Sequence, residues 1–183
     1  MTDVAEVAKE LPLRYQEEPF VAYKTVKVAL SDGLLKLSGS WETITIDDTA
    51  RCKKYPRPVP EHDAPYVGCD CGFWALKKKP GEPNYSGNVV ATVEMFGTVI
   101  HGKDGYRASR QRVLRIELPR ACECCALMED RRRMTNGMYF AINGSGHPLC
   151  VDHGETALSI NAAIRMTPAE IAAQIGTEVG WLD

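Results

Sequence analysis

The chain has 183 residues, of which 44% are hydrophobic and 25% are charged, and its formal net charge at pH 7 is −2. This composition is typical of a soluble globular protein, and the small net charge gives the molecule no bulk attraction for nucleic acid. No apolar stretch approaches the roughly 20 residues of a membrane-spanning helix, and the first ten residues lack the basic start and apolar core of a secretion signal. We therefore expect a cytoplasmic protein that does not enter a membrane.

The unusual feature of the composition is the presence of seven cysteines. They form two groups along the chain, one between residues 52 and 71 and the other between residues 122 and 150. In a reducing compartment, grouped thiols with a histidine at suitable spacing are more often metal ligands than disulfide partners. The pattern therefore indicates metal sites.

The first quarter of the chain predicts antiparallel β-structure. Residues 1–19 carry many charges and few large apolar side chains, which favours a loosely held arm or a short first helix. Residues 20–30 alternate between apolar and polar types, as in a half-buried strand. Residues 31–33 read Ser-Asp-Gly, which is a turn signal, and residues 35–37 resume the alternation. We expect a hairpin here, followed by a short strand at residues 41–46.

Prolines at positions 56, 58, 60 and 65 make residues 47–67 an extended loop with little apolar surface to fix it. A bound metal ion can order such a segment where hydrophobic burial cannot. Three thiols and one imidazole in or just beyond the loop form a standard tetrahedral zinc set, namely Cys52, His62, Cys69 and Cys71. His101 is the rival of His62 for the fourth position. The alternative is that these cysteines are buried strand and core residues without a metal.

A second hairpin is expected downstream. Residues 73–76 are apolar enough to enter the core, and residues 77–81 return to solvent. Residues 89–101 have the strongest strand pattern in the chain, with Gly97 marking a bulge or a close approach by another backbone. Residues 112–118 alternate again after a turn, so the two segments are expected to pair.

Four residues near that second turn combine a candidate base with a cation, as a catalytic cluster would. They are His101, Asp104, Tyr106 and Arg107. Because no nucleophile with a matched base accompanies them, we expect a hairpin tip at which Tyr106 packs and Arg107 pairs with a carboxylate.

Short motifs in this part of the chain resemble a known group of proteins. Residues 69–75 read Cys-Asp-Cys-Gly-Phe-Trp-Ala, and residues 105–108 read Gly-Tyr-Arg-Ala. Over residues 20–118 the chain is similar to uncharacterised actinobacterial and actinobacteriophage proteins that carry a Cys-x-Cys-Gly-aromatic-Ala element and a Gly-Tyr-Arg-Ala element, although two aromatic residues stand here where the group has one. The resemblance implies a phage or actinobacterial origin and no particular activity. It also implies one structural unit that contains Cys52, Cys69, Cys71, Gly105, Tyr106 and Arg107.

Beyond Pro119 the chain carries two ligand pairs at zinc-finger spacing. Cys122-x-x-Cys125 is followed by 24 residues and then by Cys150-x-x-His153. Two residues between ligands let a tight turn direct both side chains at one ion. The pattern resembles treble-clef zinc modules, in which a knuckle and a hairpin precede a second ligand pair at the start of a helix.

Within that module we expect a hairpin strand at residues 138–142 and the helix at residues 156–164. Cys124 is a spare thiol that could replace Cys122 or Cys125 as a ligand, and His147 is a fallback ligand. The alternative is a set of buried cysteines that hold no metal.

Three consecutive arginines lie inside the module: Arg131, Arg132 and Arg133. On a finger loop they could contact phosphates of a nucleic acid. The acidic residues immediately before them, Glu129 and Asp130, are local partners that would compete for the same charges.

The last helix is sharply defined by its ends. Thr167 is an N-cap, Pro168 suits the first helical position, Glu170 completes a capping box and Gly176 ends the helix. The helix is expected to dock through its apolar side, while Trp181 beyond it could instead anchor a partner.

Together these patterns predict an α+β protein. An arm at residues 1–19 precedes an antiparallel β-rich unit with a zinc-stabilised loop at residues 20–118, a treble-clef-like zinc module at residues 119–166 and a C-terminal docking helix at residues 167–183. Because four protein ligands close a zinc site, we expect two structural Zn²⁺ ions in a non-enzymatic binding protein that contacts a protein partner, in the host cytoplasm if a phage encodes it. The alternatives are a nucleic-acid-binding zinc finger that uses the three arginines and a metal-dependent hydrolase.

Overall fold

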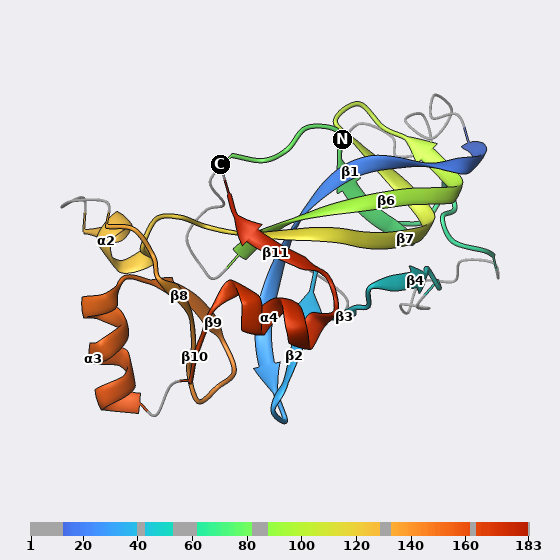
Figure 1. The fold of residues 1–183 in the computed structure, drawn as a ribbon. Coiled ribbons are helices and arrows are strands. Elements are labelled where there is room, and N and C mark those ends of the chain that lie inside the picture. Colours follow the sequence, from blue (N-terminus) through green and yellow to red (C-terminus); the bar gives the residue numbers. More distant parts are fainter. Residues whose placement is uncertain are drawn as a thin grey trace, which may run out of the picture. The chain divides into compact units, whose positions relative to one another are not determined.

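The computed structural model describes residues 13–39, 43–52, 62–81, 88–128, 133–161 and 164–182. These residues are rich in β-strands, most of which pair antiparallel, and contain few helices (Figure 1). The chain divides into two compact units, the first with residues 1–24, 47–79 and 92–113 and the second with residues 25–46, 80–91 and 114–183. No helix in the described ranges is long and apolar enough to cross a membrane. Each unit contains one of the two cysteine groups.

Three long strands contribute residues to both units. They are β1 (Leu13–Ser31), β6 (Asn88–His101) and β7 (Gly105–Leu118), and β6 pairs with both of the others. The predicted strand at residues 89–101 and its pairing with the following segment are therefore confirmed. β7 begins earlier than the sequence pattern indicated, because its first residues pair with a short strand of the first unit.

That short strand is β5 (Phe73–Leu76), which lies between β1 and β7 in the first unit and pairs antiparallel with each. Its side chains alternate, with Phe73 and Ala75 buried and Trp74 and Leu76 exposed. A second short strand, β4 (Asp47–Thr49), pairs with β7 at residues 110–112. β5 therefore fixes the end of the cysteine knuckle at residues 69–72 to the sheet.

Two expectations for the first unit need correction. β1 begins at Leu13, so residues 13–19 form part of a strand rather than an arm or a helix. Tyr15 is 73% exposed there, and such a strand end leaves no hydrophobic periodicity in the sequence. The predicted loop at residues 47–67 starts with the strand β4. Residues 1–12 and most of the proline-rich stretch, at 53–61, lie outside the described residues.

The second unit contains the first predicted hairpin. β1 pairs with β2 (Leu34–Ser38), and the turn between them places Asp32 and Gly33 at positive φ, as an Asp-Gly turn requires. β3 (Thr43–Ile44) then pairs with β2. The hairpin is confirmed, while residues 40–42 of the expected third strand, with Trp41, lie outside the described residues.

A three-stranded antiparallel sheet follows in the same unit, with the order β10-β8-β9. Its strands are β8 (Gly137–Phe140), β9 (Gly146–Leu149) and β10 (Ile164–Met166), and the helices α2 (Glu123–Leu127) and α3 (Val151–Asn161) flank the hairpin in sequence. The expected strand near residue 138 is confirmed. The helix expected at residues 156–164 is misplaced, because α3 begins directly after Cys150 and Ile164 belongs to β10.

The C-terminal helix α4 (Pro168–Ile175) has the predicted ends. Thr167 and Glu170 exchange capping hydrogen bonds, and Gly176 adopts the left-handed conformation that ends the helix. The hydrogen bonds from Thr167 lower the pKa of Glu170. Ile171 is completely buried. After the helix, β11 (Glu178–Trp181) adds to β7 as a parallel strand, so Trp181 belongs to the sheet edge.

Gly97 shows why β6 needs a glycine. Its φ is +79°, and a Cβ atom at this position would overlap Oγ of Ser109 on β7. The same Oγ accepts a hydrogen bond from the backbone N–H of Thr98 at 2.9 Å. The close approach at Gly97 therefore comes from a side chain rather than from another backbone, and any side chain at residue 97 would disrupt it.

We predict that Gly97→Ala lowers the free energy of unfolding by about 2 kcal/mol, since an L-residue is strained at this φ and its methyl group meets Ser109. Denaturant unfolding followed by circular dichroism measures the loss. Gly81→Ala is the matched control, because a Cβ there meets no heavy atom within 4 Å. Equal losses in the two variants would contradict this account.

Candidate metal centres

Each unit brings four metal-binding side chains together, and these are the two sets predicted from the sequence. One contains Cys52, His62, Cys69 and Cys71, and the other contains Cys122, Cys125, Cys150 and His153. Within each set the candidate ligand atoms all lie within 4.8 Å of one another. Each set is compatible with one metal ion.

The spacing within the sets can be compared with a real coordination sphere. A tetrahedron with metal–sulfur bonds of about 2.3 Å and metal–nitrogen bonds of about 2.0 Å has sulfur–sulfur edges of about 3.8 Å and sulfur–nitrogen edges of about 3.5 Å. In the first set, the Sγ atoms of Cys52 and Cys69 are 3.8 Å apart, and Sγ of Cys71 is 3.4 Å from Nε2 of His62. The observed separations match the edges of such a tetrahedron.

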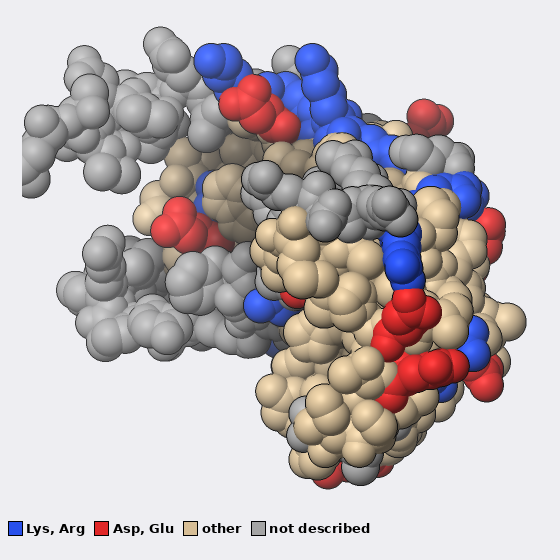
Figure 2. Space-filling model, turned by 90° about the vertical axis from the view of Figure 1, so that its left-hand side faces the viewer, with Lys and Arg blue, Asp and Glu red and all other residues tan. Residues whose placement is uncertain are grey.

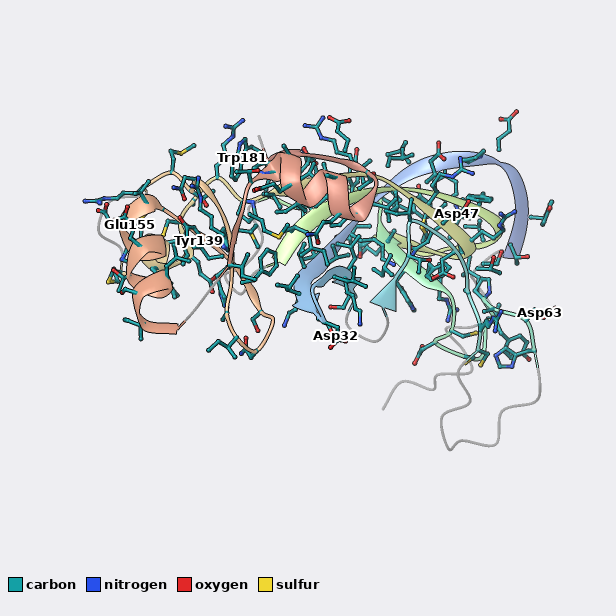
Figure 3. All side chains as sticks on the ribbon, turned by 60° about the horizontal axis from the view of Figure 1, so that its bottom comes forward. Asp32, Asp47, Asp63, Tyr139, Glu155 and Trp181 are labelled. Atoms are coloured by element: carbon teal, nitrogen blue, oxygen red, sulfur yellow. The ribbon has the colours of Figure 1, made fainter. Side chains whose placement is uncertain are left out.

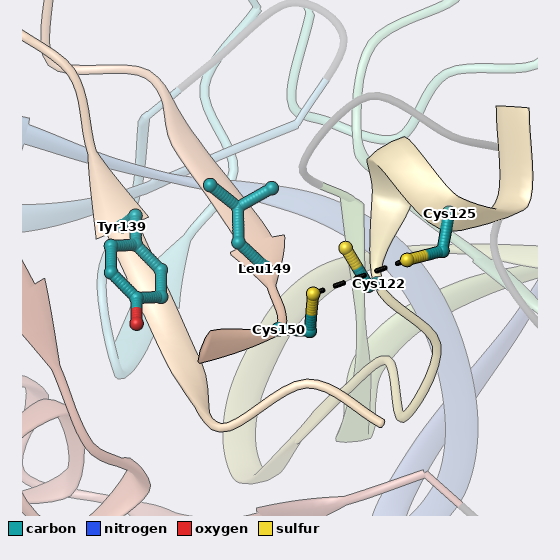
Figure 4. Close-up of a cluster of buried hydrophobic side chains, with 5 residues drawn as sticks. All are labelled: Cys122, Cys125, Tyr139, Leu149 and Cys150. Carbon is teal, nitrogen blue, oxygen red and sulfur yellow. Dashed lines mark hydrogen bonds between the residues drawn. The ribbon is translucent and has the colours of Figure 1, made fainter. Parts of the chain in front are cut away.

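The second set shows the same spacing. The sulfurs of Cys125 and Cys150 are 3.9 Å apart and point toward each other in Figure 4. Nδ1 of His153 lies 3.5 Å from the sulfurs of both Cys122 and Cys125 and 3.3 Å from that of Cys150. These four separations agree with a tetrahedral site of three sulfurs and one nitrogen.

Local backbone structure places these four ligands. Cys122 immediately precedes α2 and Cys125 lies within it, so one helical turn presents both thiols on the same side. Cys150 follows β9, and His153 lies in the first turn of α3. The ligand pairs are thus carried by two short helices that the β8–β9 hairpin connects.

The second centre is enclosed by apolar groups. Tyr139 and Leu149 are buried in one cluster with its three cysteines, and Ala157 packs against them (Figure 4). A Cβ atom at Gly154 would overlap the ring of Tyr139, so α3 can approach the hairpin only with a glycine there. This packing excludes water from the sulfurs and suits a closed site.

Burial favours a higher pKa at both Cys125 and Cys150, but hydrogen bonds make the pKa values of these two thiols differ. At Cys150 the backbone N–H of His153 and the other ligand side chains outweigh burial and lower the pKa to about 7. At Cys125 burial and the neighbouring thiols raise the pKa, although the backbone N–H of Arg133 opposes them. Metal binding at this centre must therefore displace the proton of Cys125.

Neither of the two alternative ligands near the second centre, Cys124 and His147, belongs to its set of four. Burial, followed by the charges of its neighbours, raises the pKa of Cys124, which packs at the edge of the cluster. Nδ1 of His147 lies 2.9 Å from Oε2 of Glu123, and this hydrogen bond raises the histidine pKa. His147 is therefore committed to an ion pair rather than to the thiols.

The first centre is built on a knuckle of backbone. The N–H of Cys69 donates to the carbonyl of Tyr66 at 3.1 Å, and Gly72 has φ +104° with Pro65 and Arg107 packed where a Cβ would lie. His62 stacks on Tyr66, with ring centroids 4.6 Å apart. In Figure 3 the sulfur atoms of this centre lie beside the labelled Asp63. All four ligands are half-buried, so this centre is more open than the second.

The thiols of the first centre are also unequal. Burial raises the pKa of Cys71 to about 11, although the backbone N–H of Tyr66 acts in the opposite direction. At Cys69 burial raises the pKa, but the hydrogen bond from the Cys71 backbone and those from its fellow ligands outweigh it and lower the pKa. Cys69 therefore loses its proton at a lower pH than Cys71 does. A metal ion that binds this centre must displace the proton of Cys71.

The four residues near the second turn lie at a hairpin tip, as expected. The ring of His101 packs edge-on to that of Tyr106, with centroids 5.2 Å apart, and stacks on that of Phe20 at 6.2 Å. His101 belongs to neither set of candidate metal ligands. The expected packing of Tyr106 is confirmed. Of the described carboxylates, only that of Asp70 acts on Arg107 through its charge, and the guanidinium of Arg107 donates to the carbonyl of Cys69 and lies 5.0 Å from the Trp74 ring.

The arginine run is only partly described. Arg133 forms an ion pair with Asp152, while Arg131 and Arg132 lie outside the described residues. On the face drawn in Figure 2, basic and acidic side chains of described residues are interspersed.

Comparisons with models of protein families, with curated proteins and with solved structures found no match for this chain.

We predict that Cys125→Ser removes one of two bound metal equivalents, whereas Cys124→Ser, one residue away, leaves both. The reason is that Cys125 belongs to the set of four and Cys124 does not. Metal analysis of protein purified without added zinc gives the stoichiometry. Loss of an equivalent in both variants, or in neither, would contradict the assignment.

A parallel pair of variants tests the first centre. His62→Ala should lower the metal content by one equivalent or weaken that site, because its Nε2 completes the tetrahedral spacing. His101→Ala should leave the content unchanged, since His101 lies among aromatic rings. If the metal followed His101 instead, the ligand set of this centre would be wrong.

Proposed function

We propose that this chain is a non-enzymatic binding protein in which each centre holds one structural Zn²⁺ ion and the protein surface contacts a macromolecular partner. The observation that carries the proposal is the tetrahedral spacing of two sets of three sulfurs and one nitrogen. Soft sulfur ligands favour zinc among the common divalent ions of cells. Four protein ligands leave no position for the exchangeable water on which zinc hydrolases depend.

We further propose that the second centre is a treble-clef zinc module. The support is the order of its parts: the Cys122–Cys125 pair on α2, the β8–β9 hairpin, and the Cys150–His153 pair at the start of α3. In such a module the ligands lie on short segments, so the ion supplies much of its stability.

A protein partner is favoured by the exposed apolar side chains of the second unit. Large exposed hydrophobic groups concentrate between residues 127 and 164, and apolar surface marks interaction sites where it is contiguous. They are Leu127, Met128, Met134, Ile142, Val151, Leu158, Ile160 and Ile164. Two of them, Ile142 and Ile164, line one cavity of about 210 Å³ together with Leu30 and Phe140. That volume is below the range of small-molecule sites and suits a single partner side chain.

The resemblance to actinobacterial and actinobacteriophage proteins directs the search for the partner. Capture from an actinobacterial lysate should be carried out with the zinc-loaded protein and with an Ile142→Ser/Ile164→Ser variant as the matched control. Partners retained by the first and lost by the second would support a protein-binding role. Equal recovery by the two would locate the interaction elsewhere.

Cobalt substitution tests the structural role of the metals. We predict that the Co²⁺ protein shows two tetrahedral sites with intense thiolate charge-transfer bands and that the spectra do not change with added anions, because each site is filled by protein ligands. A five-coordinate site, or a spectrum that shifts when azide or phosphate is added, would reveal an open position and favour a hydrolase instead.

A further inference from the structure

Arg107 is a buried cation beside the first centre. It lies on β7, and its residue is only 5% exposed. Its Nη1 donates to the backbone carbonyl of Cys69, and its guanidinium covers one side of the Trp74 ring at 5.0 Å. Its Cγ lies 3.0 Å from the position that a Cβ of Gly72 would take. The side chain therefore runs along the knuckle that carries two of the ligands.

This burial is unfavourable unless a negative charge lies nearby. A guanidinium does not lose its proton in proteins, and a buried charge without compensation is costly. Nε of Arg107 is also buried without a hydrogen-bond partner among the described residues. The carbonyl of Cys69 and the ring of Trp74 supply only partial charges. Burial lowers the pKa of Arg107, and the groups that oppose this effect are Cys71, Asp70 and Cys69.

A loaded metal centre would add a negative charge to that of Asp70. Zn²⁺ with three thiolates and one neutral imidazole carries one net negative charge, and two of the three sulfurs belong to the knuckle along which Arg107 runs. We propose that Arg107 is the counter-ion of the first centre, and that its positive charge sets the metal affinity of that centre. The inference rests on the proposed function, because it requires zinc at this set of ligands.

Backbone N–H groups donate to thiols at both centres, but the second centre also lies at the start of a helix. Its thiols accept hydrogen bonds from backbone N–H groups, from His153 to Cys150 and from Arg133 to Cys125. Cys150 also stands directly before the N-terminus of α3, where the helix dipole favours a thiolate. The side chain of Arg133 forms an ion pair with Asp152. A change at residue 107 should therefore leave the second centre unaffected.

The test compares Arg107→Met, Arg107→Lys and the control Arg112→Met, which alters an arginine on the same strand that is exposed and pairs with Asp47 and Glu94 at 3.5 Å. Zinc affinities are measured by competition with a chromophoric chelator, with the second centre as an internal reference in every sample. Loss of an interaction just outside a metal's ligands typically weakens binding by about 10–100-fold. Arg107→Met should lose that much at one site only, Arg107→Lys should regain part of the loss, and Arg112→Met should bind as the wild type.

The outcomes separate the two claims. If wild-type protein binds fewer than two zinc ions, the proposed function fails before Arg107 is considered. If it binds two and Arg107→Met binds both with unchanged affinity, the counter-ion assignment is overturned. An Arg107→Lys variant as weak as Arg107→Met would also overturn it, because the lysine restores the charge without the guanidinium shape. Circular dichroism and zinc retention at the second centre show that each variant is folded.

Discussion

The constraint on which this structure depends is the shortness of the segments that carry its two cysteine groups. The segments that carry the ligands are a short knuckle before β5 and two helices of which α2 is only one turn long. Hydrophobic burial at about 25 cal/mol per Å² cannot hold such short segments against the conformational entropy that they lose. Zinc binding by small domains is worth about 10–16 kcal/mol at neutral pH, which equals the whole stability of a typical domain. In the proposed metal-bound state, coordination holds these short segments in place.

The sequence predicted both ligand sets because most ligands are close neighbours along the chain. Pairs separated by one or two residues meet by local geometry alone, as at Cys69 and Cys71 or at Cys122 and Cys125. The same holds for the Asp-Gly hairpin at residues 32 and 33 and for the capping box of α4, where each signal and its partner lie within a few residues. Local chemistry specifies these features, so a single sequence reveals them.

Features that depend on distant partners were missed. Residues 13–19 form part of a strand in which Tyr15 is exposed. Their sequence shows no alternation of apolar and polar residues that would have predicted this strand. α3 begins at Val151 rather than at Thr156, because Cys150, whose thiol accepts a hydrogen bond from the backbone N–H of His153, stands directly before its first residue. Arg107 meets the carbonyl of Cys69, which is 38 positions earlier in the chain. Its position in a Gly-Tyr-Arg-Ala element was visible, but nothing local in that element indicates a backbone carbonyl as the partner.

The two centres have the same types of ligand, but they differ in how deeply the ligands are buried and in the groups around them. Three thiolates around Zn²⁺ leave a negative charge that must be balanced wherever water is excluded. At the more enclosed second centre, backbone N–H groups and the start of α3 can balance it without burying another ion. The first centre is more open, is not followed by a helix and has a buried guanidinium at its knuckle. Backbone dipoles are fixed by the fold, whereas a single side chain can be exchanged in one substitution. The first centre is therefore the one whose metal affinity can change without rebuilding the fold around it.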